Sequence, residues 1–235
     1  MYTAIILSAG SGSRMKSDIP KQYMQLNGRP VIYYSIKAFE DSDIDNIVIV
    51  CGTDYIDYFR NDIIKKYGFK KIKAIVEGGK ERYNSVYEGI KASKGADYVL
   101  IHDGARPLVS ADIISRSMDS VAKYGACVVG MPVKDTIKVS DENGYAADTP
   151  DRKYLWQIQT PQSFSYELID RAYTILLHDI EAGKNVPAIT DDAMIIEYAT
   201  DTKVRLIEGN YTNIKVTTPE DMGVAEVFLN NIKST

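Results

Sequence analysis

The chain opens with the stretch MYTAIILSAGSGSRM, residues 1–15, in which a short apolar run meets a glycine-rich segment. The run over residues 4–7 is continuous and rich in isoleucine, which is typical of a strand buried on both faces of a sheet. It has no basic region before it and stops at Gly10, so it predicts a first strand and not a signal peptide. A glycine-rich turn directly after a buried strand can approach a ligand closely.

Further apolar runs follow at regular intervals, and stretches with helical spacing lie between them. The predicted strands cover residues 47–51, 72–76, 98–101 and 127–130, and the predicted helices cover residues 31–39, 55–67, 84–92 and 113–124. This alternation indicates βαβ crossovers. We therefore predict an α/β fold, a three-layer open sandwich around a mostly parallel twisted sheet, with ligands bound beyond the carboxyl ends of its strands.

The alternation is interrupted over residues 133–155. Two short extended segments flank Asn143-Gly144, and this dipeptide is a strong signal for a hairpin. We expect a β-arm that leaves the main sheet at Pro132 and returns through residues 155–162. After it the pattern predicts helices near residues 166–177 and 191–198, a strand over residues 203–207 and a final helix from Pro219. No repeat or linker is visible, so we expect a single domain over residues 1–235.

The composition limits the classes of function. The 235 residues are 45% apolar and carry 28 basic and 32 acidic side chains, a net charge of −4, which argues against nucleic-acid or membrane-surface binding. No apolar run approaches the roughly 20 residues of a membrane span. Cys51 and Cys127 lie in apolar runs without a CxxC spacing, so we expect buried free thiols and a cytoplasmic location.

Residues 8–21 carry the strongest chemical signal. A dinucleotide-binding GxGxxG motif would need glycine where Met15 stands, and a phosphate-binding Walker loop would need Gly-Lys-Ser/Thr. The segment instead contains two cations, Arg14 and Lys21, which can stabilise the charge that grows on a transferring phosphoryl group. A plain glycine turn beside two solvated cations is the alternative, and Pro20-Lys21-Gln22 after the glycines favours the phosphate site.

Several ordered blocks carry a resemblance to the sugar-nucleotide transferase superfamily, and within it to the 2-C-methyl-D-erythritol 4-phosphate cytidylyltransferase family. The blocks are GSGSRM with PKQY, GGKERYNSV from Gly78, HDGARP from His102, PVKDTIK from Pro132, DRKYLWQIQTPQSF from Asp151, TDDA from Thr190 and EGNYTNIKVTTPEDM from Glu208. The resemblance covers nearly the whole chain. It implies CTP and methylerythritol phosphate as substrates, Mg²⁺ as cofactor, and a homodimer in which the arm reaches the neighbouring subunit.

The resemblance also implies a set of site residues. The residues expected to be catalytic are Arg14 and Lys21, on the triphosphate, and Arg152 and Lys215, on the incoming phosphate. Those expected to bind substrate are Ser8, Ala9, Gly10, Gly12, Gly79, Ser85, Asp103, Gly104, Arg106, Thr136, Thr160 and Thr190. Asp103 follows a predicted strand and is also the candidate Mg²⁺ ligand, because this ion takes one or two carboxylates beside phosphate oxygens. Arg152 and Thr136 are expected on the arm, and the sequence leaves both action within their own subunit and action in trans open.

Plainer explanations exist for some of these residues. Asn84 or Ser85 could cap a helix, and Asp103 could close a turn or pair with Arg106. We assign His102 no catalytic role, because a phosphate monoester is already anionic near neutral pH. Two other functions remain open from the sequence: ribitol-5-phosphate cytidylyltransferase, and a non-catalytic nucleotide-binding module that would lack the attack-side cations. The chain also has Gly104 where the family commonly has alanine.

Overall fold

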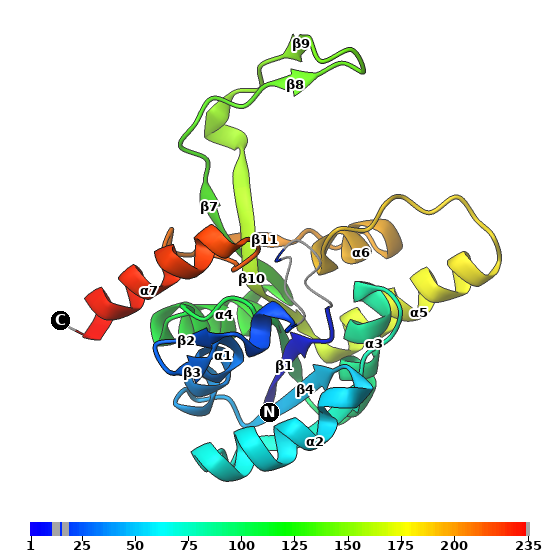
Figure 1. Cartoon of the computed structure of the whole chain (residues 1–235). Helices are drawn as coiled ribbons and strands as arrows, with labels where there is room; N and C mark the ends of the chain where they lie inside the picture. The colour runs from blue at the N-terminus through cyan, green and yellow to red at the C-terminus, as the bar shows by residue number, and fades with distance from the viewer. Residues whose placement is uncertain (11–14, 16–18, 234–235) are drawn as a thin grey trace.

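A seven-stranded sheet forms the centre of the protein, in a computed structural model that describes residues 1–10, 15 and 19–233 (Figure 1). The strand order is β11-β7-β10-β6-β1-β4-β5. These strands are β1 Tyr2–Ser8, β4 Asn46–Cys51, β5 Ile72–Glu77, β6 Tyr98–Asp103, β7 Ala126–Pro132, β10 Trp156–Ser165 and β11 Arg205–Glu208. Only β10 runs antiparallel to its neighbours in this sheet. The predicted α/β fold with a mostly parallel sheet is confirmed.

Helices cover both faces of the sheet. The helices are α1 Val31–Glu40, α2 Ile56–Tyr58, α3 Arg82–Ala92, α4 Ala111–Tyr124, α5 Tyr166–Glu181, α6 Asp192–Ala199 and α7 Pro219–Lys233. Side chains alternate along each strand, so Ala4 and Ile6 of β1 pack with α1 and α4, whereas Ile5 packs with α3 and α5. The helix predicted over residues 55–67 is helical but irregular, because the π-helix Phe59–Lys65 follows α2.

The strand β10 is the main element that the sequence prediction missed. We predicted residues 155–162 only as the return from the arm, but all of them after residue 155 belong to a ten-residue strand between β6 and β7. Its polar side chains hid it: Gln159, Thr160 and Gln162 are all buried. Pro161 also argues against a central strand, and the register with β7 shifts between Ile158 and Gln162 to accommodate the irregularity.

The β-arm projects away from the body of the protein between β7 and β10 (Figure 1). Its strands β8 Val139–Ser140 and β9 Ala146–Asp148 pair antiparallel, as the Asn143-Gly144 signal predicted, and Gly144 has a φ of 84°. The amide of Val133 donates to the carbonyl of Leu155 and closes the base. Every residue over 134–149 is exposed, so the arm contributes nothing to the core.

Smaller elements complete the fold. They are the short pair β2 Gln25–Leu26 and β3 Arg29–Pro30, and the 3-10 turns Lys21–Tyr23, Thr53–Tyr55 and Arg152–Tyr154. Cys51 and Cys127 are buried free thiols, as predicted. Among the described helices, none combines the length and apolar character that crossing a membrane requires.

Tight packing fixes the loops at the carboxyl ends of β1, β5 and β6. The amide of Gly104 donates to the carbonyl of Leu7 at 2.8 Å, and a Cβ at position 104 would lie 2.8 Å from that oxygen and 2.2 Å from Ile32 Cδ1. A Cβ at Gly78 would lie 2.4 Å from the Ala9 Cβ. Glycine at these two positions lets the three loops meet at one edge of the sheet.

Candidate active site

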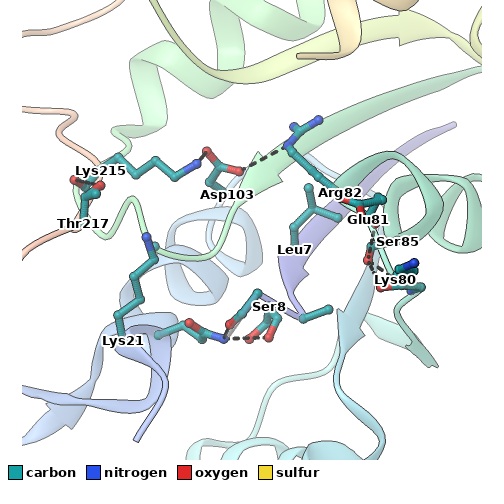
Figure 2. Close-up of a pocket in the computed structure, with 15 residues that line it drawn as sticks. Leu7, Ser8, Lys21, Lys80, Glu81, Arg82, Ser85, Asp103, Lys215 and Thr217 are labelled. Carbon is teal, nitrogen blue, oxygen red and sulfur yellow. Dashed lines mark hydrogen bonds and ion pairs between the residues drawn. The ribbon is translucent and has the colours of Figure 1, made fainter. Parts of the chain in front are cut away.

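A cavity of about 650 Å³ opens where these loops meet (Figure 2). Its lining includes eight residues that the sequence analysis predicted for the site: Ser8, Ala9, Gly10, Lys21, Gly79, Ser85, Asp103 and Lys215. They come from segments as far apart in the chain as Ser8 and Lys215, and the carboxyl ends of parallel strands bring them together. The predicted residues Gly12 and Arg14 lie outside the described residues.

The segment after β1 is held by the short turn that follows it. The buried Gln22 side chain donates from Nε2 to the carbonyl of Ser8 at 2.8 Å and to the carbonyl of Gly10 at 2.9 Å. The hydroxyls of Ser8 and Tyr23 lie 2.9 Å apart and bond to each other. The Ser8 hydroxyl is therefore engaged within the protein, and Gln22 fixes the backbone course at the cavity wall.

Asp103 is surrounded by cations at the end of β6. Lys215 Nζ lies 2.8 Å from Asp103 Oδ2, Arg106 Nε lies 3.7 Å from the same oxygen, and Arg82 Nε lies 4.0 Å from Oδ1. Burial by itself raises the pKa of this carboxyl, but the charges of Lys215, Arg82 and Arg106 outweigh burial and hold the pKa well below its usual range. Asp103 is ionised at neutral pH, and its ion pair with Arg106 is one of three.

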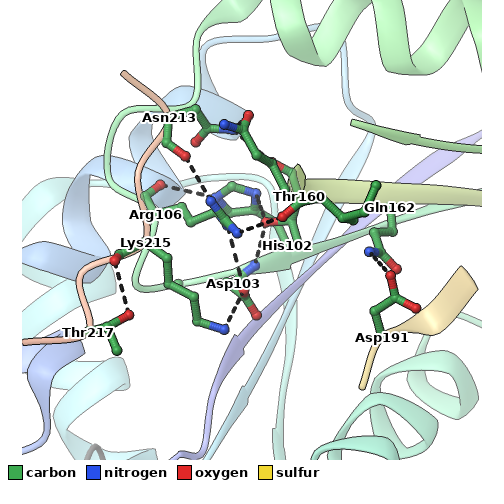
Figure 3. Close-up of polar contacts among 12 residues, drawn as sticks. His102, Asp103, Arg106, Thr160, Gln162, Asp191, Asn213, Lys215 and Thr217 are labelled. Atoms are coloured by element: carbon green, nitrogen blue, oxygen red, sulfur yellow. Dashed lines mark hydrogen bonds and ion pairs between the residues drawn. The ribbon is translucent and has the colours of Figure 1, made fainter. Parts of the chain in front are cut away.

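A chain of hydrogen bonds runs from His102 through Thr160 to the backbone amide of Asp103 (Figure 3). His102 Nε2 lies 3.2 Å from the carbonyl of Arg106, which can only accept, so Nε2 carries the proton. Nδ1 then accepts from the Thr160 hydroxyl at 3.0 Å, and the same hydroxyl accepts from the Asp103 amide at 3.1 Å. Burial lowers the pKa of His102 to about 4, which keeps the ring neutral. His102 is fully buried and Thr160 is engaged with it.

Arg106 clamps the segment that carries Lys215. Its Nη1 donates to the carbonyl of Asn213 at 2.8 Å, and the buried Asn213 side chain donates to the carbonyl of Thr160 at 3.0 Å. The amide of Val216 donates to the carbonyl of Ala105 at 2.8 Å. Lys215 therefore lies between two anchored residues, which directs its amine toward Asp103 (Figure 3).

Comparisons with known proteins identify the family. A family model described as 2-C-methyl-D-erythritol 4-phosphate cytidylyltransferase matches residues 2–231. The chain belongs to this family. A protein of that name from Lachnospira eligens is 52% identical over 230 residues, covering 97% of this chain and 99% of its own length. Another, from Lachnoclostridium phytofermentans, is 49% identical over 227 residues, covering 97% of this chain and 95% of its own.

Solved structures of proteins from this family are similar to this chain. A 4-diphosphocytidyl-2C-methyl-D-erythritol synthase from Anaerococcus prevotii has a TM-score of 0.85 and 33% identity, with 97% of this chain and 96% of that one covered. The 2-C-methyl-D-erythritol 4-phosphate cytidylyltransferase from Thermus thermophilus has a TM-score of 0.72 and 26% identity, with 96% and 98% covered. These proteins are named for methylerythritol phosphate, so the ribitol alternative is not favoured.

Six residues predicted from the cytidylyltransferase resemblance are not among those that line the cavity: Gly104, Arg106, Thr136, Arg152, Thr160 and Thr190. Arg152 is exposed near the arm and donates from Nη1 to the carbonyl of Lys134 at 2.7 Å. Thr136 is exposed on the arm itself. The Thr190 hydroxyl bonds to Met194 Sδ, and the cap of α6 is the next residue, Asp191, whose carboxylate accepts from the Met194 amide at 3.0 Å.

The capping alternative for α3 holds only in part, because neither Asn84 nor Ser85 is the N-cap residue. Glu81 caps this helix, and Asn84 is its reciprocal partner, accepting from the Glu81 amide at 3.1 Å. Ser85 lies one turn into the helix, where its hydroxyl accepts from the Gly79 amide at 3.1 Å. Ser85 thus shapes the loop beside the cavity instead of starting the helix.

Arg82 lies on the cavity wall and was not predicted from the sequence. Arg82 begins α3, and its two terminal nitrogens each bind a carboxylate oxygen of Asp192 at 2.7 Å. The partners are 110 positions apart, so no local pattern pointed to the pair. The block GGKERYNSV contained Arg82 and TDDA contained Asp192. Lys80 and Thr217 also line the cavity and were not predicted.

Proposed function

We propose that this protein transfers the cytidylyl group of CTP to 2-C-methyl-D-erythritol 4-phosphate and releases diphosphate, a step of non-mevalonate isoprenoid biosynthesis. The observation that carries the proposal is the cavity at the strand ends, which combines Lys21, Lys215 and the ionised Asp103. Family membership supplies the substrates. We also propose that residues 1–235 act as one nucleotidyltransferase domain with an arm.

The reaction forms one bond and breaks one. An acceptor phosphate oxygen attacks the α-phosphorus of CTP, and the bond from that phosphorus to the oxygen bridging to the β-phosphorus breaks. No proton has to be removed, because the acceptor phosphate is already anionic. Lys21 and Arg14 would stabilise the triphosphate, and Lys215 and Arg152 would hold the incoming phosphate, so catalysis depends on positioning and charge stabilisation.

The residues present fit a magnesium ion bound together with nucleotide. No three His, Cys, Asp or Glu side chains cluster into a metal site within the described part of the chain. This agrees with Mg²⁺ chemistry, since the ion is held by one or two carboxylates plus phosphate oxygens and water. Asp103 would be the protein ligand. When bound, the ion neutralises charge on the triphosphate and the departing diphosphate.

We propose that the arm joins two copies of the chain in the cytoplasm, and that Arg152 and Thr136 serve the neighbouring copy's cavity. Exposed apolar side chains on and beside the arm support this: Ile137 is 39% exposed, Val139 47%, Tyr145 74% and Tyr154 75%. Apolar surface of this kind is typical of a contact between subunits. The net charge of −4 argues against nucleic acid or a membrane surface as a partner. The ligands that we propose for the cations of the cavity are small anions.

Diphosphate release from CTP tests the reaction directly. Methylerythritol phosphate and ribitol phosphate are compared as acceptors, each with and without Mg²⁺. We expect release only with methylerythritol phosphate and Mg²⁺. Release with ribitol phosphate alone would contradict the acceptor, and equal rates after chelation would contradict the role of the metal.

Mixing two inactive variants tests the trans arrangement. Arg152→Ala and Lys215→Ala proteins are each assayed alone and after joint refolding. If Arg152 serves the neighbouring cavity, random pairing restores about a quarter of wild-type sites, because each mixed dimer has one site with both residues intact. No recovery in a mixture shown to contain mixed dimers would place Arg152 and its cavity in the same chain.

A further inference from the structure

An ion pair between Arg82 and Asp192 connects the cavity wall to the start of α6. Arg82 lies on that wall with its side chain 32% exposed, whereas the Asp192 side chain is fully buried. Both contacts of the fork are 2.7 Å long, so the terminal nitrogens of Arg82 point away from the cavity into the core. The buried carboxylate of Asp192 therefore fixes the position of the Arg82 guanidinium beside the cavity.

Asp192 is itself fixed by neighbours from two other elements. The Tyr173 hydroxyl, on α5, donates to Asp192 Oδ1 at 2.6 Å. Gln162, on β10, accepts from the backbone amides of Asp192 and Ala193 at 2.9 and 3.2 Å, and its Nε2 donates to Asp191 Oδ2 at 3.1 Å (Figure 3). These hydrogen bonds fix the start of α6 relative to α5 and β10.

Two parts of the cavity depend on where Arg82 is held. Arg82 is the first residue of α3, directly after the loop that contains Gly79, so its anchor also sets the start of that helix. Its Nε lies 4.0 Å from Asp103 Oδ1, on the side opposite Lys215 (Figure 2). Displacement of Arg82 would therefore move the loop and turn the carboxylate together.

Stability alone gives little reason for such a pair. A buried ion pair adds little over apolar side chains of similar volume, because both charges lose their hydration. A fork to a fully buried carboxylate does, however, fix the orientation of a guanidinium more closely than solvent or a single contact would.

We propose that Asp192 is a positioning residue of the nucleotide site, acting through Arg82 on the start of α3 and on Asp103. Asp192 is fully buried and does not line the cavity, so it would act without contacting the nucleotide. The inference rests on the proposed function in one respect, that the nucleotide is CTP.

The chain offers a matched control in Asp179. This carboxylate is 8% exposed, accepts from the Tyr198 hydroxyl at 2.8 Å and pairs with Lys184 at 2.6 Å. It therefore has the same kinds of partner as Asp192, a tyrosine hydroxyl and a base. None of these three residues lines the cavity.

The test compares Asp192→Asn, Arg82→Gln, the double variant and Asp179→Asn. CTP affinity is measured by calorimetry without acceptor, and KM and kcat are measured with acceptor. We expect Asp192→Asn to weaken CTP binding and raise KM for CTP about tenfold, as removal of a group that orients a ligand-binding residue does. Arg82→Gln should do the same, and the double variant should be no worse than the worse single variant. Asp179→Asn should lower only the melting temperature.

CTP affinity within twofold of wild type for Asp192→Asn would overturn the inference, as would fully additive losses in the double variant. If Asp192→Asn does not fold, Arg82→Gln and Tyr173→Phe decide, since the latter removes only one hydrogen bond from the same carboxylate. A wild-type protein that binds CTP but releases no diphosphate contradicts the proposed reaction alone. One that does not bind CTP contradicts both.

Discussion

The cavity and the β-arm differ in the contacts that stabilise them. The cavity loops are fixed by buried hydrogen bonds from distant segments, such as Asn213 to Thr160 and Arg106 to Asn213. The arm over residues 134–149 is exposed throughout, and its contacts are local, such as Lys138 Nζ to Thr149 Oγ1 at 2.6 Å. The cavity is thus shaped by the chain's own core, whereas the arm has no core to pack on. Changes in the two regions should therefore differ in kind.

The largest expected effect is on turnover, at the cavity. Lys215→Ala removes a cation that lines the cavity and that we propose holds the incoming phosphate, so we expect kcat to fall about a hundredfold or more. The arm counterpart, Lys138→Ala, should stay within twofold of wild type in the same diphosphate-release assay. Equal losses of kcat in both variants would contradict the view that the cavity cations contribute to turnover and Lys138 of the arm does not.

His102 is expected to change the free energy of unfolding by about 3 kcal/mol between neutral and acidic pH. Its pKa is lowered to about 4 in the folded protein, so the unfolded chain takes up a proton first. The stability that depends on the neutral ring is complete above about pH 6.5 and decreases as the pH falls toward about 4. Urea unfolding of wild type and His102→Gln across this range measures it. The same slope in both proteins would contradict the assignment to His102. The arm contains no histidine, so shortening it should leave the slope unchanged.

Two glycine substitutions sharpen the comparison. Gly104→Ala places a Cβ 2.8 Å from the Leu7 carbonyl oxygen and 2.2 Å from Ile32 Cδ1, so we expect a loss of about 1–3 kcal/mol. At Gly144 the φ of 84° disfavours alanine by about 1 kcal/mol, and the strain stays within the arm. Thermal unfolding should therefore detect Gly104→Ala and hardly Gly144→Ala. The reverse order would show that the arm is coupled to the core.

The smallest effect is expected from shortening the arm. Replacement of residues 138–148 by a two-glycine turn removes only exposed side chains, so unfolding free energy at high dilution should change by less than about 0.5 kcal/mol. Sedimentation of the same protein should show loss of the proposed dimer. A loss of stability above about 1 kcal/mol in the monomer would mean that the arm packs on its own chain.

The sequence predicted most of the fold because apolar runs alternate with helical spacing, and it missed β10 because Gln159, Thr160 and Gln162 are polar yet buried in hydrogen bonds. The family resemblance supplied most of the residues that face the cavity from strand ends, at positions where the predicted strands end. Local motifs could not predict which side chains are engaged internally: Thr160 bonds to His102, and Arg106 clamps Asn213. Such pairings form between distant segments, so spacing along the chain contains no sign of them.

Because both native cysteines are buried, a cysteine introduced on the arm can be labelled selectively. Burial raises the pKa of both Cys51 and Cys127 to about 12, so thiol-selective dyes should leave them unmodified in the folded protein. A single cysteine introduced at Tyr145, which is 74% exposed, would then be the reactive thiol of the chain. Energy transfer between donor-labelled and acceptor-labelled copies would follow subunit exchange in real time, with no change to the cavity.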